Sequence, residues 1–249
     1  MELSDFFKAH PRVAIAFSGG VDSAYLLYAA VNYGEKVHAY YGKSVFQPQF
    51  ELDDAKRLAK QFHVDLTVIE VDVLRCPEIV VNPADRCYFC KQLLFSKILA
   101  QATKDGYGIL CDGTNASDDP GDRPGMRALT ELAVRSPLRE CGLTKEEIRR
   151  RAKEAGLHIW NKPAYACLST RIPTGELITK EKLERTERAE NFLFSLGFTD
   201  FRVRMSGNAA KLQIPASQME KVIKNRTLIV RELKQYYSAV TLDLEARNE

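Results

Sequence analysis

The sequence predicts an α/β fold: a parallel sheet with helices on both faces, followed by a small α+β domain. Three observations predict it. As far as Asp112, short apolar segments typical of buried strands alternate with segments of helical periodicity. The turn after the first apolar segment contains two adjacent glycines, Gly19 and Gly20. After Gly175, one long helical segment is followed by short strand-like segments.

The expected elements of the larger domain follow one another in βαβ order. The apolar segments expected to form strands are residues 12–18, 36–41, 64–71 and 108–112. The segments with helical spacing are residues 22–32, 51–62 and 93–102. A further helix is expected to begin with a capping box at Thr144 and to end at Gly156. Strands that alternate with helices in this way form parallel sheets covered on both faces.

The change of pattern near residue 175 predicts a domain boundary. Residues 1–175 would form the larger domain and residues 176–249 the smaller one. The segments expected in the smaller domain are a helix at 179–196 and strands at 201–205, 210–214 and 239–244. We expect this domain to bind substrate or to join chains into an oligomer.

Composition restricts the class of protein. The 249 residues are 45% hydrophobic and 28% charged, which is typical of a globular protein with a sizeable core. A net charge of +3 does not favour nucleic-acid binding, which needs a concentrated basic face. No apolar run is long enough to cross a bilayer, and nothing near Met1 resembles a signal peptide. We therefore expect a cytoplasmic protein that binds no membrane and whose six cysteines form no structural disulfides.

The segment from Ser18 to Ser23 (SGGVDS) lies between the first expected strand and the first expected helix. Its paired glycines, Gly19 and Gly20, allow a tight turn that aims successive backbone N–H groups at one point. The helix that starts at Asp22 adds its positive end, and the two serines can add hydroxyl donors. The segment therefore predicts a phosphate-binding loop. It is not a Walker A loop, because no lysine follows a second glycine.

Cys87 and Cys90 form a C-x-x-C pair at the expected start of a helix. Such a pair can be redox-active, half of a zinc site or part of an iron–sulfur site. A structural zinc ion would need four protein ligands, and the sequence has no second C-x-x-C and no pair of histidines at ligand spacing. Together with Cys167, the pair could hold three irons of a [4Fe–4S] cluster and leave the fourth iron open. The remaining cysteines are expected to be structural: Cys76, Cys111 and Cys141.

With these motifs the chain resembles the LarE family of sulfur transferases, within the PP-loop ATP pyrophosphatases. The superfamily signature SGGxDS matches Ser18–Ser23, and the more specific segments are DRCYFCK at 85–91, DGTNASDDPGDRPG at 112–125, and residues 136–171. The resemblance implies that ATP adenylates a carboxylate of a pyridinium biscarboxylate mononucleotide. Sulfur then displaces AMP and gives a thiocarboxylate, in the biosynthesis of the nickel-pincer nucleotide used by lactate racemase.

The resemblance also implies roles for single residues. The residues implied to bind ATP and its Mg²⁺ are Ser18, Gly19, Gly20, Asp22, Ser23 and Thr114, with the Mg²⁺ on Asp22. Two variants exist in the family: one sacrifices a cysteine at the position of Cys167, and the other holds a [4Fe–4S] cluster with three cysteines. Because Cys87, Cys90 and Cys167 are all present, we hypothesise the cluster variant, with these three as the catalytic residues.

Several charged residues are further candidates. The resemblance makes Arg171, Arg202 and Arg204 candidates for the substrate phosphate, which a guanidinium fork suits, although Arg202 and Arg204 could also form a solvated strand face. Glu190 is either a site residue or part of a solvated helix face. The polar loop contributes three residues that could hold metal or gate the site: Asp118, Asp122 and Arg123. The basic run at 149–151 is expected to be surface.

Other functions remain open at this point. An iron–sulfur-dependent tRNA thiolase also combines a PP-loop with three cysteines. An ammonia-using ligase would need no such cysteines, and a nucleotide sensor would bind ATP without releasing pyrophosphate. The expected partners are a small-molecule mononucleotide, further copies of this chain, and a sulfide source or a downstream nickel-insertion protein.

Overall fold

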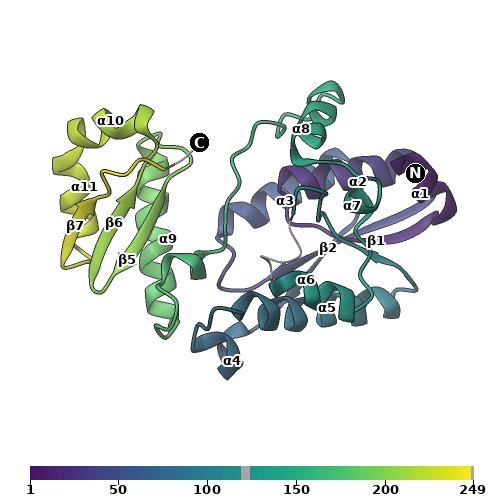
Figure 1. The fold of residues 1–249 in the computed structure, drawn as a ribbon, viewed down its shortest axis with the longest axis horizontal. Coiled ribbons are helices and arrows are strands. Elements are labelled where there is room, and N and C mark those ends of the chain that lie inside the picture. The colour runs from purple at the N-terminus through teal and green to yellow at the C-terminus, as the bar shows by residue number, and fades with distance from the viewer. Residues whose placement is uncertain (119–123, 248–249) are drawn as a thin grey trace. The chain divides into compact units, whose positions relative to one another are not determined.

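The computed structural model describes residues 1–118 and 124–247, which form two compact units (Figure 1). The first unit contains Met1–Val73 and Ala84–Lys162, and the second contains Leu74–Pro83 and Pro163–Glu249. The chain thus leaves the first unit after Lys162 and not near residue 175, where we placed the boundary.

The short segment Leu74–Pro83 belongs to the second unit because of backbone pairing around Asn82. The Asn82 carbonyl accepts a hydrogen bond from the Gly175 N–H at 2.8 Å. Its side-chain amide donates to the carbonyls of Ile172 (3.3 Å) and Pro173 (2.7 Å). Because these partners are some ninety residues downstream, the sequence pattern could not show that the segment leaves the first unit.

The first unit is built on a parallel four-stranded sheet in the order β3-β2-β1-β4. Its strands are β1 (Arg12–Ala16), β2 (Lys36–Lys43), β3 (Leu66–Glu70) and β4 (Leu110–Cys111). Ile15 lies opposite Ala39 of β2 on one side and opposite Cys111 of β4 on the other. All four strands coincide with the expected apolar segments, and the parallel order confirms the predicted fold class.

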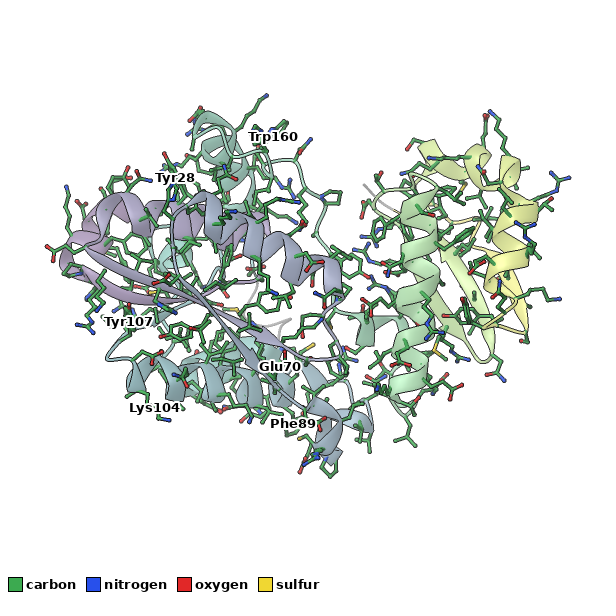
Figure 2. The ribbon with its side chains drawn as sticks, turned by 180° about the vertical axis from the view of Figure 1, so that it is seen from behind. Tyr28, Glu70, Phe89, Lys104, Tyr107 and Trp160 are labelled. Atoms are coloured by element: carbon green, nitrogen blue, oxygen red, sulfur yellow. The ribbon has the colours of Figure 1, made fainter. Side chains whose placement is uncertain are left out.

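Helices cover both faces of this sheet, as predicted. One layer contains α1 (Leu3–Ala9), α2 (Val21–Tyr33), α3 (Gln49–Gln61), α7 (Pro137–Glu140) and α8 (Lys145–Glu154). The other contains α5 (Arg86–Lys104) and α6 (Pro124–Glu131). Figure 2 labels Tyr28 and Trp160 in the first layer, and Phe89 and Lys104 of α5 in the second. Between two such layers the central strand β1 buries Val13, Ala14 and Ile15 completely.

The helix ends follow their sequence signals where those signals are local. The Thr144 hydroxyl accepts a hydrogen bond from the Glu147 N–H at 3.3 Å, which is the Thr144 half of the predicted capping box, while the Glu147 carboxylate pairs with Arg150 and Arg151. Gly156 follows α8 with φ +72°, as predicted. Helix α5 begins at Arg86, so it includes both Cys87 and Cys90. Helix α1 was not predicted, although Leu3, Phe6 and Phe7 fill the core.

The second unit is an α+β unit, in agreement with its sequence pattern. Strands β5 (Arg202–Ser206) and β6 (Ala209–Gln213) are antiparallel, and β7 (Ala239–Leu242) pairs with β6 in parallel. Its helices are α4 (Pro77–Val80), α9 (Lys180–Ser195), α10 (Met219–Lys224) and α11 (Arg226–Leu233). Short 3₁₀ turns complete the chain at Val73–Arg75, Leu168–Arg171 and Ala216–Gln218. None of the helices among the described residues is long and apolar enough to span a membrane.

The strand order of the first unit positions its candidate site. Strand β1 has β2 on one side and β4 on the other, so the connections leaving the carboxyl ends of β1 and β3 run to opposite sides. Ligands of open α/β sheets bind at such a switch point. The segment Ser18–Ser23 follows β1, and the segment beginning at Asp112 follows β4. Both therefore lie at the same edge of the sheet.

Candidate functional site

The PP-loop, Ser18–Ser23, is closed by its own two serines. The Ser18 and Ser23 hydroxyl oxygens are 3.0 Å apart, and the Ser23 hydroxyl donates to the Gly20 carbonyl at 3.2 Å. The Ser18 N–H in turn donates to the Ser23 hydroxyl at 3.3 Å. The Gly20 N–H donates to the Ser18 hydroxyl, also at 3.3 Å. The serines predicted as phosphate donors thus shape the loop as well.

Gly19 is required by both backbone conformation and space. Its φ is +72°, and a Cβ built there would lie 3.1 Å from the backbone nitrogen of Ala55 in α3. A left-handed conformation costs a residue with a Cβ about 1–2 kcal/mol. The close approach of α3 adds a steric cost, because the Ala55 backbone has to move.

We therefore expect Gly19→Ala to lower the free energy of unfolding by more than Gly156→Ala. Gly156 has the same φ of +72°, but a Cβ there would meet nothing within 4 Å. Its substitution measures the conformational cost alone, about 1–2 kcal/mol. Urea denaturation of both variants checks the difference. If the two variants lose the same free energy of unfolding, the contact with Ala55 adds nothing to the conformational cost.

Asp22, in the first turn of α2, presents an unsatisfied carboxylate oxygen. Its Oδ2 accepts a hydrogen bond from the Asn115 side-chain amide at 3.2 Å. Its Oδ1 is buried and accepts no hydrogen bond from the described part of the chain. Burial raises the pKa of Asp22, while the Asn115 bond and the positive charge of Lys145 oppose that rise. A buried carboxylate oxygen without a donor fits a hard cation, so Asp22 suits the Mg²⁺ predicted for it.

The segment after β4 packs directly on the PP-loop. A Cβ at Gly113 would lie 2.9 Å from the backbone nitrogen of Ser23. The Thr114 hydroxyl donates to Asp112 Oδ2 at 2.5 Å, and the Ser136 hydroxyl donates to Asp112 Oδ1 at 2.6 Å. Thr114, predicted to bind nucleotide, is buried, and its hydroxyl already donates a hydrogen bond to Asp112. The residue of this segment that reaches Asp22 is Asn115, to which we assigned no role.

The polar loop contributes one described candidate. The Asp118 carboxylate accepts a hydrogen bond from the Asn115 N–H at 3.0 Å and so supports the residue that contacts Asp22. Asp122 and Arg123, the other two candidates, lie outside the described residues.

A lysine that sequence reasoning did not assign also reaches the loop. Lys162 Nζ lies 2.7 Å from Asp54 Oδ2 and 3.4 Å from the Gly19 carbonyl oxygen. The guanidinium of Arg149 holds this segment by donating to the carbonyls of Trp160 (2.7 Å) and Lys162 (2.8 Å). The sequence signal that could have found Lys162 is its place at the start of the segment KPAYACLSTR, residues 162–171, within the stretch 136–171 that resembles the LarE family.

The three arginines of the basic run on α8 differ in burial and in their partners. Arg149 is partly buried and anchors a loop, so our surface prediction was wrong for it. Arg150 pairs with Glu147 at 2.7 Å and with Glu154 at 2.5 Å, and it is exposed as predicted. Arg151 pairs with Glu147 at 2.5 Å.

The C-x-x-C pair lies in the first two turns of α5. Residues three apart share a helix face, so Cys87 and Cys90 project from the same side. The Cys87 thiol is exposed, and the Arg86 guanidinium lies 3.8 Å from its sulfur. The other cysteines of this unit, Cys111 and Cys141, belong to the apolar core or pack against it.

Cys167 lies in the second unit, immediately before the 3₁₀ turn Leu168–Arg171. Its carbonyl accepts hydrogen bonds from the Thr170 N–H (3.0 Å) and the Thr170 hydroxyl (2.8 Å). Its sulfur lies 3.1 Å from the hydroxyl of the buried Ser169. The thiol is free and half-buried, on a backbone that is held at two points.

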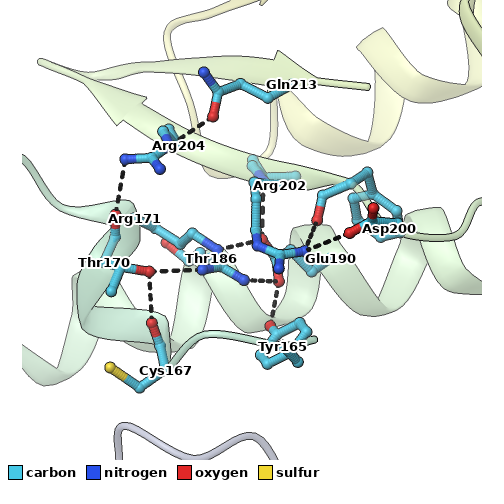
Figure 3. A network of polar contacts seen from close by, with 12 residues as sticks. Tyr165, Cys167, Thr170, Arg171, Thr186, Glu190, Asp200, Arg202, Arg204 and Gln213 are labelled. Carbon is cyan, nitrogen blue, oxygen red and sulfur yellow. Dashed lines mark hydrogen bonds and ion pairs between the residues drawn. The ribbon is translucent and has the colours of Figure 1, made fainter. Parts of the chain in front are cut away.

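A buried ion pair supports this turn (Figure 3). Arg171 is 1% exposed; its Nε and Nη2 donate to the two Glu190 oxygens at 2.7 and 3.2 Å. Its Nη1 donates to the Thr170 hydroxyl at 2.7 Å. Burial lowers the pKa of Arg171, but the hydrogen bond and charge of Glu190 outweigh it and raise the pKa overall. A chain of contacts thus runs from Glu190 through Arg171 and Thr170 to the backbone of Cys167.

Glu190 is therefore not part of a solvated helix face. Its carboxylate also accepts hydrogen bonds from the Tyr165 hydroxyl and, at 2.9 Å, from the Val203 N–H of β5. Four donors around one carboxylate explain how a charged residue can be 1% exposed.

Arg202 and Arg204 occupy the same strand but differ in exposure. Arg202 is buried, and it donates to the carbonyls of Phe201 and Ala164, both at 2.6 Å, so the solvated-face alternative is wrong for it. Arg204 is exposed and donates to Gln213 at 2.6 Å. Burial, together with the positive charges of the nearby Arg171 and Arg247, lowers the pKa of Arg202 to about 10. Two carboxylates face these guanidinium groups: Glu190 pairs with Arg171 at 2.7 Å, and Asp200 lies 3.7 Å from Arg202 and 3.1 Å from Arg247. With Arg204, four guanidinium groups thus meet two carboxylates, which leaves positive charge that an anion would relieve.

The three predicted cluster ligands lie in different units: Cys87 and Cys90 in the first, Cys167 in the second. In residues 1–118 and 124–247, no group of three or more His, Cys, Asp or Glu side chains is arranged to bind a metal ion. Thiolates are nevertheless the ligands that iron–sulfur clusters require. The cluster remains a prediction.

Comparison with known proteins agrees with the PP-loop geometry. Residues 12–79 match the family model described as Queuosine biosynthesis protein QueC. The chain is 38% identical to an uncharacterized protein of Synechocystis sp. over 98% of this chain and 92% of that protein. It is 32% identical to the pyridinium-3,5-bisthiocarboxylic acid mononucleotide synthase of Lactiplantibacillus plantarum, over 94% of this chain and 86% of the relative. This chain belongs to the LarE family.

A more distant likeness relates this LarE-family chain to tRNA-modifying enzymes. It is 27% identical to the tRNA-specific 2-thiouridylase MnmA of Thermotoga sp. over 76% of this chain, but over only 61% of that relative. The LarE-family assignment and the PP-loop geometry together make the protein an ATP-using enzyme and a sulfur transferase.

Proposed function

We propose that this enzyme adenylates a carboxylate of pyridinium-3,5-biscarboxylic acid mononucleotide and then replaces AMP by sulfur. The observation that carries the ATP half is the buried Oδ1 of Asp22 in the PP-loop, which has no hydrogen-bond partner among the described residues. Support for the acceptor comes from the 32% identity to a synthase of the corresponding bisthiocarboxylic acid mononucleotide. The role is a step in the biosynthesis of a nickel-pincer nucleotide of the kind used by lactate racemase.

The reaction balances in two steps. A substrate carboxylate oxygen attacks the α-phosphorus of ATP, the bond to the β-phosphate oxygen breaks, and pyrophosphate leaves. A sulfur nucleophile then attacks the carboxyl carbon, and AMP leaves with the electron pair of the broken C–O bond. Asp22 would hold the Mg²⁺ that offsets charge on the pyrophosphate, and the loop N–H groups would bind its oxygens.

The sulfur is proposed to come from the three-cysteine set. Cys87, Cys90 and Cys167 would hold a [4Fe–4S] cluster that, when bound, supplies sulfide at an open iron. In the alternative, the Cys167 sulfur itself is transferred and the residue becomes dehydroalanine, so that each chain reacts once.

Iron and acid-labile sulfide analysis after anaerobic purification separates these two routes. The cluster route predicts about four irons per chain, lost or destabilised in Cys167→Ala. Colourless protein that loses the elements of H₂S from Cys167 during one turnover would establish the sacrificial route instead.

Arg202 and Arg204 are proposed to bind the phosphate of the mononucleotide. The excess of guanidinium groups over carboxylates around Arg202 supports an anion at this place. We assign Arg171 differently from its sequence-based role. Its bonds to Glu190 and Thr170 make it a residue that positions the Cys167 turn.

The second candidate acceptor is tRNA, which the likeness to the 2-thiouridylase favours. Each acceptor is offered separately with ATP and Mg²⁺, and AMP release and product mass are measured. The proposal predicts AMP release with the biscarboxylate mononucleotide and a product in which sulfur replaces one carboxyl oxygen. Thiolation of unmodified tRNA, with no reaction of the mononucleotide, would overturn it.

The partners are proposals of the same kind. Further copies of this chain would join through the second unit. A sulfide source would reload an open iron, and a nickel-insertion protein would use the finished product.

A further inference from the structure

The PP-loop of this protein lacks a cation of its own. ATP carries several negative charges, and in a Walker A loop a lysine of the loop itself binds the phosphates and offsets part of this charge. Residues 18–23 contain no basic residue. Backbone N–H groups and the α2 N-terminus supply only partial positive charge. A full positive charge beside the phosphates, other than Mg²⁺, would therefore come from elsewhere in the chain.

Lys162 places its ammonium group at the loop from far away in the sequence. Its Nζ lies 3.4 Å from the carbonyl oxygen of Gly19, in the middle of the phosphate-binding turn. The side chain is 22% exposed, so the ammonium is neither sealed in the core nor free in solvent. It also lies 6.0 Å from the ring centroid of Phe50, which limits where the ammonium can go.

The backbone of Lys162 is fixed by helix α8. Two guanidinium nitrogens of Arg149 bind the carbonyls of Trp160 and Lys162, and the Lys162 N–H donates to Ile159 at 2.9 Å. Helix α8 packs in turn on α2, the helix that begins at the PP-loop. The lysine is thus mounted on the same rigid part of the first unit as the loop.

Asp54 keeps the ammonium in place when no phosphate is bound. The Asp54 carboxylate lies 2.7 Å from Lys162 Nζ, and both side chains are about one-fifth exposed. The next residue, Ala55, is the one that a Cβ on Gly19 would meet. The other oxygen of Asp54, Oδ1, lies 2.7 Å from the Arg57 guanidinium. The carboxylate is thus held between two cations, and Lys162 is a cation that also contacts the loop.

We propose that Lys162 binds the β- or γ-phosphate of ATP, with Asp54 as its positioning residue. The inference rests on the use of ATP in the proposed function, but not on the identity of the acceptor. Lys162 would share its three N–H donors between Asp54 and the phosphate. It would thereby replace, from a separate loop, the lysine that Walker A proteins carry in the loop itself.

Nucleotide binding by Lys162→Gln tests the proposal. Titration calorimetry with Mg²⁺ and the α,β-methylene analogue of ATP should show affinity about ten- to a hundredfold weaker, as expected for a lost charge-assisted hydrogen bond. AMP, which has no β- or γ-phosphate, should bind within about twofold of wild type. Lys162→Arg keeps the charge and should recover part of the loss.

Two further variants separate the role of the Lys162 ammonium from a general effect of charge and from the role of Asp54. Lys153→Gln removes the same charge from α8, at an ammonium that lies 4.6 Å from the Trp160 ring centroid, and should leave both affinities unchanged. Asp54→Asn leaves the ammonium in place and should weaken analogue binding far less than Lys162→Gln. Equal losses of analogue and AMP binding, no loss of either, or equal losses in Asp54→Asn and Lys162→Gln would each overturn the proposal. These outcomes do not depend on which acceptor the enzyme uses.

Discussion

Replacing Glu190 by Ala should lower the free energy of unfolding of the second unit by about 3–5 kcal/mol. The change leaves the Arg171 guanidinium, 1% exposed, without a carboxylate partner. It also removes the acceptor of the Tyr165 hydroxyl and of the Val203 N–H. Breaking one side of a buried ion pair costs far more than the pair contributes, because the remaining charge stays desolvated. Hydrogen exchange of α9 and β5 amides, with urea denaturation, measures the loss.

A control for this prediction lies on the same helix. Glu184 pairs with Lys180 at 3.6 Å, and both side chains are well exposed. Glu184→Ala should therefore cost only a few tenths of a kcal/mol, about 0.3–0.5. If Glu184→Ala and Glu190→Ala destabilise the second unit equally, the Arg171–Glu190 pair is not the support of the Cys167 turn that its geometry indicates.

Asp22→Asn should slow ATP cleavage by at least about a hundredfold, since Mg²⁺ provides several kcal/mol of charge stabilisation in such reactions. The substitution keeps the shape of the side chain but removes the charge of the buried Oδ1, which has no hydrogen-bond donor among the described residues. We expect the wild-type rate of pyrophosphate release to rise steeply with Mg²⁺ concentration. In the variant this dependence should be weak.

The control is Asp53→Asn, which removes the same charge from α3. Asp53 is exposed and accepts a hydrogen bond from Gln49 at 2.9 Å. It should leave the rate and its Mg²⁺ dependence close to wild type. An unchanged Mg²⁺ dependence in Asp22→Asn would mean that the metal is held by other groups.

The sheet and the PP-loop could be predicted because their signals are local. Buried parallel strands read as apolar runs, and residues 18–23 determine both a turn and a helix start. Strand order then brought Asn115 to Asp22, although the two are 93 residues apart. No sequence period encodes that pairing, so its role was missed.

Charged residues on amphipathic helices were the main source of error. Arg149 and Glu190 occupy positions that are polar by pattern, and burial was decided by partners on other elements: the carbonyls after α8 for Arg149, and Arg171 for Glu190. The Lys162–Asp54 pair spans 108 residues and has the same character. Sequence patterns show which residues are charged, whereas only the fold shows which charges meet.

The most direct test of the account compares AMP and thiocarboxylate formation by wild type and Cys167→Ala in the same anaerobic reaction. The proposed ATP-binding groups belong to the first unit and the Cys167 thiol to the second, so the two half-reactions should separate. Wild type should form AMP and thiocarboxylate in equal amounts, whereas Cys167→Ala should still cleave ATP but form no thiocarboxylate. Sulfur transfer by Cys167→Ala at the wild-type rate, or thiocarboxylate formed without AMP, would contradict the account.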